Sequence, residues 1–331
     1  MFKKLSCSLL VLCVSQSSIA RPLSEQAGWD STLSLNALYI SGHSQLSTSS
    51  ENRTTNSLTN SGKSTSETLV IPLNKIFYTF DSLKTQLYFD ANNADQITTN
   101  GFQYEFGMKH QFYDDSKLTF AVFPKLSVYN EVWEDPFLVG SDREETKQKV
   151  GGGRIAIEQI FASPFTVKYA IASSSIEDEL SGQTNSLTSD EITLLNRDSI
   201  YQRFSIETMF PIQKGIFLKP TLEKNQRDAD GAANSYEDYA LKLGVLIFRE
   251  RSFWATTLSM GVQNYEATNP IFDKKQDLVY GSLSSIFSYK EPLNLRNWNW
   301  NLLGAYTQKK SDISFYDSRS IFISTGMSYQ F

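Results

Sequence analysis

The C-terminal stretch from Ser320 to Phe331 constrains the fold of this chain more than any other part of the sequence. It reads SIFISTGMSYQF, and every second residue counted back from the end is apolar or threonine, whereas the residues between are mostly polar. Alternation with a period of two predicts a β-strand with one apolar and one polar face. We therefore expect the chain to end in a strand that separates an apolar environment from water.

Four residues of this strand resemble the C-terminal signal by which bacterial outer-membrane β-barrels are recognised for insertion: Ser324, Gly326, Tyr329 and Phe331. The resemblance implies three partners, namely outer-membrane lipid, lipopolysaccharide and the barrel-assembly machinery. It also implies an N-terminal export signal and an even number of alternating strands joined by unequal connections.

Residues 1–20 have the pattern of a secretory signal peptide. Two cations, Lys3 and Lys4, precede an apolar run that ends in small residues, and we expect cleavage after Ala20. The apolar run is shorter than the about 20 residues that a transmembrane helix needs. A lipoprotein site at Cys13 is the weaker alternative, because the bulky Leu12 precedes it.

Both cysteines, Cys7 and Cys13, lie in this segment, so the mature chain is expected to form no disulfide and no thiolate metal site. The formal net charge of −5 argues against nucleic acid as a partner. We expect no cofactor and no metal.

After a short N-terminal segment, residues 21–31, alternating stretches predict about fourteen strands between residues 32 and 331. They are Thr32–Tyr39, Leu69–Phe80, Leu83–Ala91, Phe102–Phe112, Leu118–Trp133, Lys149–Phe161, Phe165–Ile176, Ile200–Phe210, Ile216–Arg227, Tyr236–Phe248, Phe253–Tyr265, Leu278–Tyr289, Trp298–Lys309 and Ser320–Phe331. Long polar connections alternate with short ones along the chain. A soluble β-sandwich does not require this alternation. The sequence therefore predicts an all-β fold, a transmembrane antiparallel up-and-down β-barrel with short periplasmic turns and longer extracellular loops.

A barrel of about fourteen strands has a free bore of roughly 15 Å once inward side chains are allowed for. The charged residues of the polar faces are expected to line it as pore residues: Glu105, Lys109, Lys125, Arg154, Glu158, Lys168, Arg203, Glu207, Lys219, Glu223, Arg227, Asp238 and Lys242. They either select solutes by their field or pair across strands and hold the wall. Since neither sign dominates, we expect weak ion selectivity at most.

The segment before the first strand is too short for a plug domain, so any constriction must come from the wall or from a loop. The best candidate is the stretch Glu177–Ser199, where Thr188 and Glu191 have the spacing of a capping box for a short helix with Ile192 and Leu195 on one face. This loop either folds into the mouth or lies outside it as a solvated cap.

Four further segments resemble a bacterial outer-membrane family that is catalogued only as a domain of unknown function. They are WEDPFLVGSDR at 133–143, NQRDADGAANS at 225–235, NPIFDK at 269–274 and FYD at 315–317. The resemblance extends from about Gly28 to Phe331 and implies export and a barrel, but no catalytic or binding residues. All four segments lie in or beside expected extracellular loops, which indicates a shared outer rim.

An enzyme is not expected. The chain holds only two histidines, His43 and His110, and no serine lies in a Gly-x-Ser-x-Gly turn. The favoured function is that of a monomeric, porin-like outer-membrane channel for passive diffusion of small hydrophilic solutes. The alternative is a non-conducting surface barrel, an adhesin or structural protein that acts through its long loops.

Overall fold

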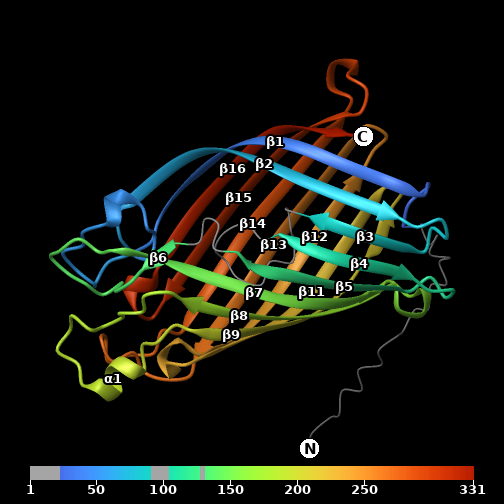
Figure 1. The fold of residues 1–331 in the computed structure, drawn as a ribbon. Coiled ribbons are helices and arrows are strands. Elements are labelled where there is room, and N and C mark those ends of the chain that lie inside the picture. The colour runs from blue at the N-terminus through green and yellow to red at the C-terminus, as the bar shows by residue number, and fades with distance from the viewer. Residues whose placement is uncertain (1–22, 91–103, 127–130) are drawn as a thin grey trace, which may run out of the picture.

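One antiparallel sheet of sixteen strands closes on itself in the computed structural model (Figure 1), which describes residues 23–90, 104–126 and 131–331. The strands are β1 (Gly28–His43), β2 (Ser64–Thr79), β3 (Thr85–Asp90), β4 (Glu105–Gln111), β5 (Lys117–Leu126), β6 (Glu131–Trp133), β7 (Glu145–Glu158), β8 (Phe165–Ile176), β9 (Ser199–Thr208), β10 (Phe210–Gln213), β11 (Ile216–Ala229), β12 (Tyr236–Phe248), β13 (Ser252–Tyr265), β14 (Leu278–Lys290), β15 (Trp298–Ser311) and β16 (Ser318–Gln330). One α-helix, α1 (Ser189–Thr193), and 3-10 turns at Ser50–Asn52, Ile160–Ala162, Ala232–Asn234, Pro292–Asn294 and Ser314–Tyr316 lie in the connections of the described chain.

Two pairings close the sheet into a barrel. The first strand, β1, pairs with the last strand, β16, and β9 pairs with β11. Within the described residues the closed ring has fourteen strands, because β6 pairs only with β7 and the short β10 only extends the edge of β11. The predicted antiparallel barrel of about fourteen strands is confirmed.

The outer face of the barrel is apolar. On β1, Leu33, Leu35 and Tyr39 are 48%, 59% and 43% exposed, whereas Asn36 and Leu38, which point the other way, are buried. The same alternation of exposed apolar residues runs along the other strands, as it does in barrels whose outer wall contacts lipid. On β16, Ile321 and Ile323 are exposed in the same way, so the apolar face predicted for the last strand is confirmed.

Aromatic side chains gather where β1, β2, β15 and β16 approach the short turns. Trp29 packs on Tyr78 with ring centroids 5.0 Å apart, and Tyr329 packs on both Trp298 at 5.2 Å and Phe331 at 4.9 Å. Aromatic girdles of this kind mark the membrane interfaces of transmembrane barrels.

Some boundaries differ from the predicted ones. Strand β1 begins at Gly28, earlier than Thr32, and the predicted strand 118–133 is divided into β5 and β6. A register shift between Phe123 and Leu126, where Pro124 cannot donate a hydrogen bond, distorts the end of β5. The predicted loop 92–101 lies outside the described residues.

No helix in the described part of the chain is long and apolar enough to cross a membrane. The long connections that the structure describes, including the loops that carry β6 and α1, lie together at one end of the barrel, and the C-terminus lies at the other end (Figure 1). The unequal connections are thus sorted to opposite ends, as the sequence predicts.

Candidate functional site

A ladder of charged side chains runs across the inner face of β8, β9, β11 and β12. The carboxylate of Glu207 lies 3.4 Å from Lys168 Nζ and 3.0 Å from Lys219 Nζ. Lys242 Nζ contacts the carboxylate of Glu223 at 2.8 Å, and Arg203 approaches the same carboxylate at 3.6 Å. Adjacent strands place these residues side by side because inward positions recur every second residue.

Toward the loop end, the ladder continues from Arg203 through the neutral side chain of Asn225 to Asp238. Arg203 Nε donates to Asn225 Oδ1 at 2.7 Å, and Asn225 Nδ2 donates to Asp238 Oδ1 at 2.6 Å. The Tyr280 hydroxyl, on β14, donates to the same oxygen at 3.2 Å. Tyr280 can lie flat across β13 because the residue beneath its ring is Gly261, where a Cβ would collide with the ring. Asp238 is only 1% exposed, so this end of the ladder is packed.

A second ionic cluster joins β3, β4 and β7. Arg154 makes two hydrogen bonds of 2.7 Å to the carboxylate of Glu105, and the Tyr88 hydroxyl contacts both residues. These side chains cross β5 above Ala121, which is small and fully buried. Nearer the turns, Lys109 Nζ contacts the carboxylate of Glu158 at 2.9 Å.

The inner wall is divided laterally. The charged clusters occupy a contiguous set of strands from β3 to β12. The inner face of β13–β16, β1 and β2 carries mainly serine, threonine, asparagine and aliphatic side chains, with Asp30, Glu67, Lys75 and Lys309 as charged exceptions. Examples from the second part are Leu38, Ile71, Ser282, Leu303 and Ser324. Single-strand patterns did not reveal this division, because it depends on which strands are neighbours in the ring.

Twelve of the thirteen charged residues predicted to line the interior lie on the inner face, and Lys125 does not. The register shift in β5 adds a residue, so that Lys125 lies against the position where Gly151 would carry a Cβ, on the same outer face as Ile155. The prediction for Lys125 was wrong because strict alternation fails at a β-bulge.

Sequence reasoning also missed inner-face residues. Lys117 falls outside the predicted strand Leu118–Trp133, but it lies on β5 directly opposite Glu158. Lys309 ends the predicted strand Trp298–Lys309, and in the structure it faces inward opposite Tyr280. Asn225 and Tyr280 join charged residues without being charged themselves, and only their contacts identify them.

The loops at one end of the barrel share a single apolar core, which we call the roof. Its buried residues come from four loops, and residues of two further loops pack against it. The members are Phe137, Leu195, Ala233, Ile313, Phe315 and Tyr316, with Leu58, Leu187, Leu194, Ile271 and Phe272 around them. The roof is therefore one folded unit rather than a set of independent loops.

The roof crosses the mouth of the barrel. Phe137 belongs to the loop before β7 and Phe315 to the loop before β16, and these strands lie on nearly opposite sides of the ring. The backbone ring is roughly 28 Å across, yet the two aromatic rings are 5.4 Å apart. The two loops can meet only if they bend inward over the opening.

Two arginines, Arg143 and Arg197, tie the roof to the barrel rim. Arg143, with no exposed surface, donates to the carbonyl oxygens of Gln45, Pro136 and Asn52 and lies over the ring of Trp133. It thereby joins the loop before β7 to the loop between β1 and β2.

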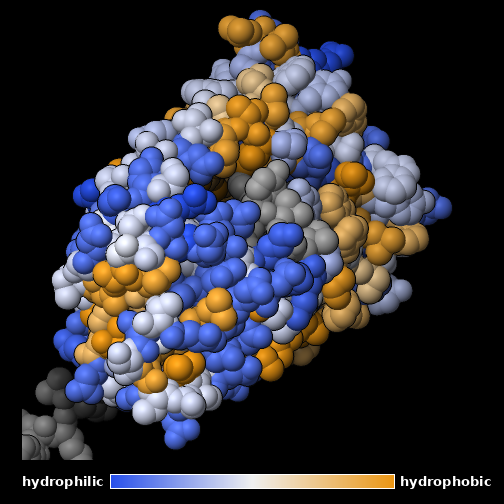
Figure 2. Space-filling view, turned by 60° about the vertical axis from the view of Figure 1, so that its left-hand side comes forward, coloured by the Kyte–Doolittle hydropathy of each residue, from blue (hydrophilic) through white to orange (hydrophobic). Residues whose placement is uncertain are grey.

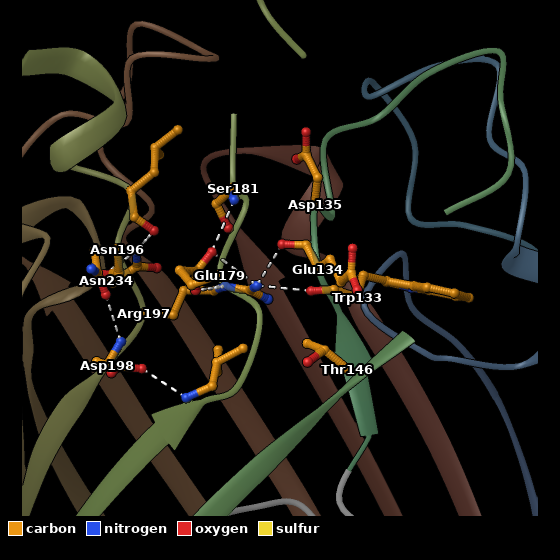
Figure 3. A network of polar contacts seen from close by, with 12 residues as sticks. Trp133, Glu134, Asp135, Thr146, Glu179, Ser181, Asn196, Arg197, Asp198 and Asn234 are labelled. Atoms are coloured by element: carbon orange, nitrogen blue, oxygen red, sulfur yellow. Dashed lines mark hydrogen bonds and ion pairs between the residues drawn. The ribbon is translucent and has the colours of Figure 1, made fainter. Parts of the chain in front are cut away.

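Arg197 joins the loop after β8 to the loop before β7 (Figure 3). Its guanidinium pairs with the Glu179 carboxylate at 2.6 Å and donates to the carbonyl oxygens of Trp133 and Glu134 at 2.8 and 2.9 Å. Asp135 completes this junction, because its carboxylate accepts hydrogen bonds from the Gly182 amide and the Thr184 hydroxyl.

The loop 177–198 contains the predicted short helix. Thr188 and Glu191 form the capping box at the start of α1, and Leu195 is buried in the roof core. Of the two alternatives for this loop, the structure shows that its apolar side packs against other loops over the mouth rather than against the barrel wall. Figure 2 shows the loop end as a mostly hydrophilic surface with small hydrophobic patches.

We expect the roof to become more stable as pH falls from neutral toward the pKa of Glu134. Burial raises the pKa of this carboxyl above its ordinary value, and the nearby carboxylates of Asp178 and Glu144 raise it further. The folded loop therefore binds more protons than the unfolded loop, and its stability increases as pH falls through the raised pKa. Cleavage of the loops by a protease, compared between wild type and Glu134→Gln at pH 7 and pH 5, measures this. Wild type should be cleaved faster than the variant at pH 7, and the difference should shrink at pH 5; a constant ratio would contradict the expectation.

The two histidines lie apart. His43 ends β1 at the loop end, whereas His110 lies on β4, where its Nδ1 is 2.9 Å from the Thr85 hydroxyl. In the described residues, no group of His, Cys, Asp and Glu side chains could hold a metal ion.

An apolar outer wall, an ionic inner face and a closed antiparallel ring together define a transmembrane β-barrel of the outer-membrane type. This chain belongs to the family described as "Protein of unknown function (DUF2860)", whose model matches residues 28–330. The four segments that resemble such a family in the sequence all contribute to the roof or its rim: Phe137 and Arg143, Ala233, Ile271 and Phe272, and Phe315 with Tyr316.

No curated protein matches the sequence. Among solved structures, a loop-deletion mutant of OmpT, an outer membrane protein of Vibrio cholerae, is 10% identical with a TM-score of 0.41, covering 91% of this chain and 99% of that one. An anion-selective porin from Comamonas acidovorans is 7% identical with a TM-score of 0.42, covering 92% and 98%. The CymD monoaromatic hydrocarbon channel is 11% identical with a TM-score of 0.47, covering 92% and 89%. At these TM-scores the likenesses carry no argument about function.

Proposed function

We propose that this protein is an outer-membrane, porin-like channel for passive diffusion of small hydrophilic solutes, with entry limited by the loop roof. The observation that carries the proposal is the ionic ladder on the inner face, from Lys168 through Glu207 and Glu223 to Asp238. Ionised side chains in the interior of a barrel of this width require water around them, because burying a charge without water costs several kcal/mol. A water-filled interior is the medium for a hydrophilic solute.

The test is single-channel conductance of refolded protein in a planar bilayer. We expect stable open steps that decrease when small neutral sugars are added, because sugar that enters the bore displaces the conducting electrolyte. A sugar polymer too large for a bore of roughly 15 Å serves as the control. It should leave unchanged the ratio of the channel conductance to the conductivity of the bulk solution. Verified folded protein that remains silent would overturn the proposal.

The roof favours a second candidate, a non-conducting surface barrel that acts through its loops. The supporting observation is the contact between Phe137 and Phe315, which places a packed apolar core over the mouth. Deleting Ser44–Thr65 separates the two functions. Loss of surface binding without change in solute uptake supports the second candidate, whereas increased uptake supports the channel.

The remaining features of the proposal concern export and partners. We propose cleavage of the signal peptide after Ala20, insertion in the outer membrane as a monomer, and contact of the outer wall with lipid and lipopolysaccharide. The C-terminal strand, with Tyr329 and Phe331, would be recognised by the assembly machinery. No catalytic role is assigned to either histidine, and the proposal requires no cofactor.

A further inference from the structure

Basic side chains outnumber carboxylates in the ionic wall, and the excess has a repeated geometry. Glu207 lies between Lys168 and Lys219, and Glu223 lies between Arg203 and Lys242. In each case one carboxylate is shared by two cations that come from the strands on its two sides.

Glu158 on β7 also has two cations nearby, but both come from the same side of its strand, Lys109 from β4 and Lys117 from β5. Lys109 Nζ contacts its carboxylate at 2.9 Å, and Lys117 lies directly opposite on the neighbouring strand β5. In the same part of the wall, Glu105 accepts two hydrogen bonds from Arg154. Glu158, Glu207 and Glu223 therefore each lie near two cations, so that basic side chains outnumber carboxylates in these clusters of the described wall.

Two more cations of the inner face have neutral or distant neighbours. Arg227 donates to the Ser199 hydroxyl and to the Arg197 carbonyl oxygen, both at 2.8 Å, and lies over the ring of Tyr201. Lys309 has no carboxylate within ion-pair distance in the described part of the chain. The carboxylate of Asp238, which accepts hydrogen bonds from Asn225 and Tyr280, offsets part of the positive charge of Arg227 and Lys309.

Few further carboxylates lie on the inner face of the described strands. On the inner face Asp90 is paired with Lys75 at 3.1 Å, and Asp30 and Glu67 lie away from the ladder, on β1 and β2. The sequence outside the described ranges between residues 91 and 130 contains a single acid, Asp95, and no basic residue. The positive excess of the wall therefore contrasts with the formal net charge of −5 of the whole chain.

From this geometry we infer that the channel prefers anions, and that its hydrophilic solutes include small carboxylates and phosphates. The inference rests on the proposed channel function and adds the sign and place of its selectivity. Charged side chains that line a bore select ions of the opposite charge. Because the Debye length is about 10 Å at 0.1 M salt, an excess charge on the wall acts across much of a bore of roughly 15 Å.

The test is the reversal potential of the reconstituted protein across a tenfold gradient of KCl, whose two ions have similar mobility. We expect the sign that corresponds to chloride preference, with a permeability ratio of about two or more that decreases as salt rises, because salt screens the wall. Open channels that prefer potassium, or neither ion, would overturn the inference and leave the channel proposal intact. Absence of any conductance would overturn both.

Two variants locate the selectivity, and a third is their matched control. Lys219→Gln should lower the chloride preference, and Glu207→Gln, which removes the negative charge between Lys168 and Lys219, should raise it. Lys224 is on the same strand as Lys219 but on the outer face, where it pairs with Glu237 at 2.9 Å. Lys224→Gln makes the same change in net charge and should leave the reversal potential unaltered. If the inner and outer lysine variants shift it equally, the wall charges are not the cause and the inference fails.

Discussion

Replacing Arg143 with methionine is expected to unfold the roof while the barrel stays folded, and to raise the conductance of the channel severalfold. The methionine fills a similar volume, but three buried carbonyl oxygens, those of Gln45, Pro136 and Asn52, lose their donors. Each buried polar group left without a partner costs about 1–3 kcal/mol. The loss is confined to the loops, because the barrel strands keep their own hydrogen-bonded pairing.

Two measurements check this prediction. Limited proteolysis of folded protein should cleave the Arg143→Met loops much faster than the wild-type loops, and the single-channel conductance should increase. Arg143→Lys should be nearly as damaging, because one ammonium group cannot reach three carbonyl oxygens in the geometry of a guanidinium. Arg319→Met, which changes an exposed arginine on β16, is the control and should behave like wild type. If the loops of Arg143→Met are cleaved at the same rate as those of wild type, this arginine does not hold the roof.

Replacing Gly326 with valine is expected to reduce the yield of folded barrel severalfold. Gly326 lies on β16 opposite Asn36 at the seam where the last strand meets the first. A Cβ at this position would overlap the backbone carbonyl oxygen of Leu35 and the Asn36 side chain, so the two strands would have to separate. Overpacking of this kind costs about 1–3 kcal/mol, and here it acts on a pairing that closes the ring.

Refolding in vitro isolates this packing effect, because it does not depend on recognition of the C-terminal strand by a cell. The folded fraction is measured by the mobility shift of unheated protein on a denaturing gel, and stability by the urea midpoint. Gly304→Val is the matched control, since Gly304 lies on the neighbouring β15 with open space where its Cβ would be. Valine favours strands intrinsically, so a more stable Gly326→Val barrel would refute the expected clash.

Much of the barrel could be predicted from the sequence because its signal is local. Alternation along β1 and β16 depends only on the period of a strand, and the turns and loops are marked by runs of polar residues. Twelve of the thirteen charged residues expected to line the bore lie on the inner face for the same reason. The exception, Lys125, follows Pro124 at the register shift in β5, where the local period is broken.

The capping box of α1 was also predictable, since Thr188 and Glu191 are three residues apart and their hydrogen bonds form within one turn. The position of that helix over the mouth was not. Its buried neighbours, among them Phe137 and Phe315, come from loops far apart in the chain, and no pattern within one loop indicates which other loop it contacts.

The sequence by itself determined the class of fold, the direction in which most side chains point and the grouping of loops at one end. Tertiary structure alone decided that the loops form one roof, that Glu207 and Glu223 each lie between two cations, and that the charged strands are contiguous. The physical reason is that alternation is a property of neighbouring residues. The roof and the charge ladder depend on which strands meet when the ring closes, through the pairings of β1 with β16 and of β9 with β11.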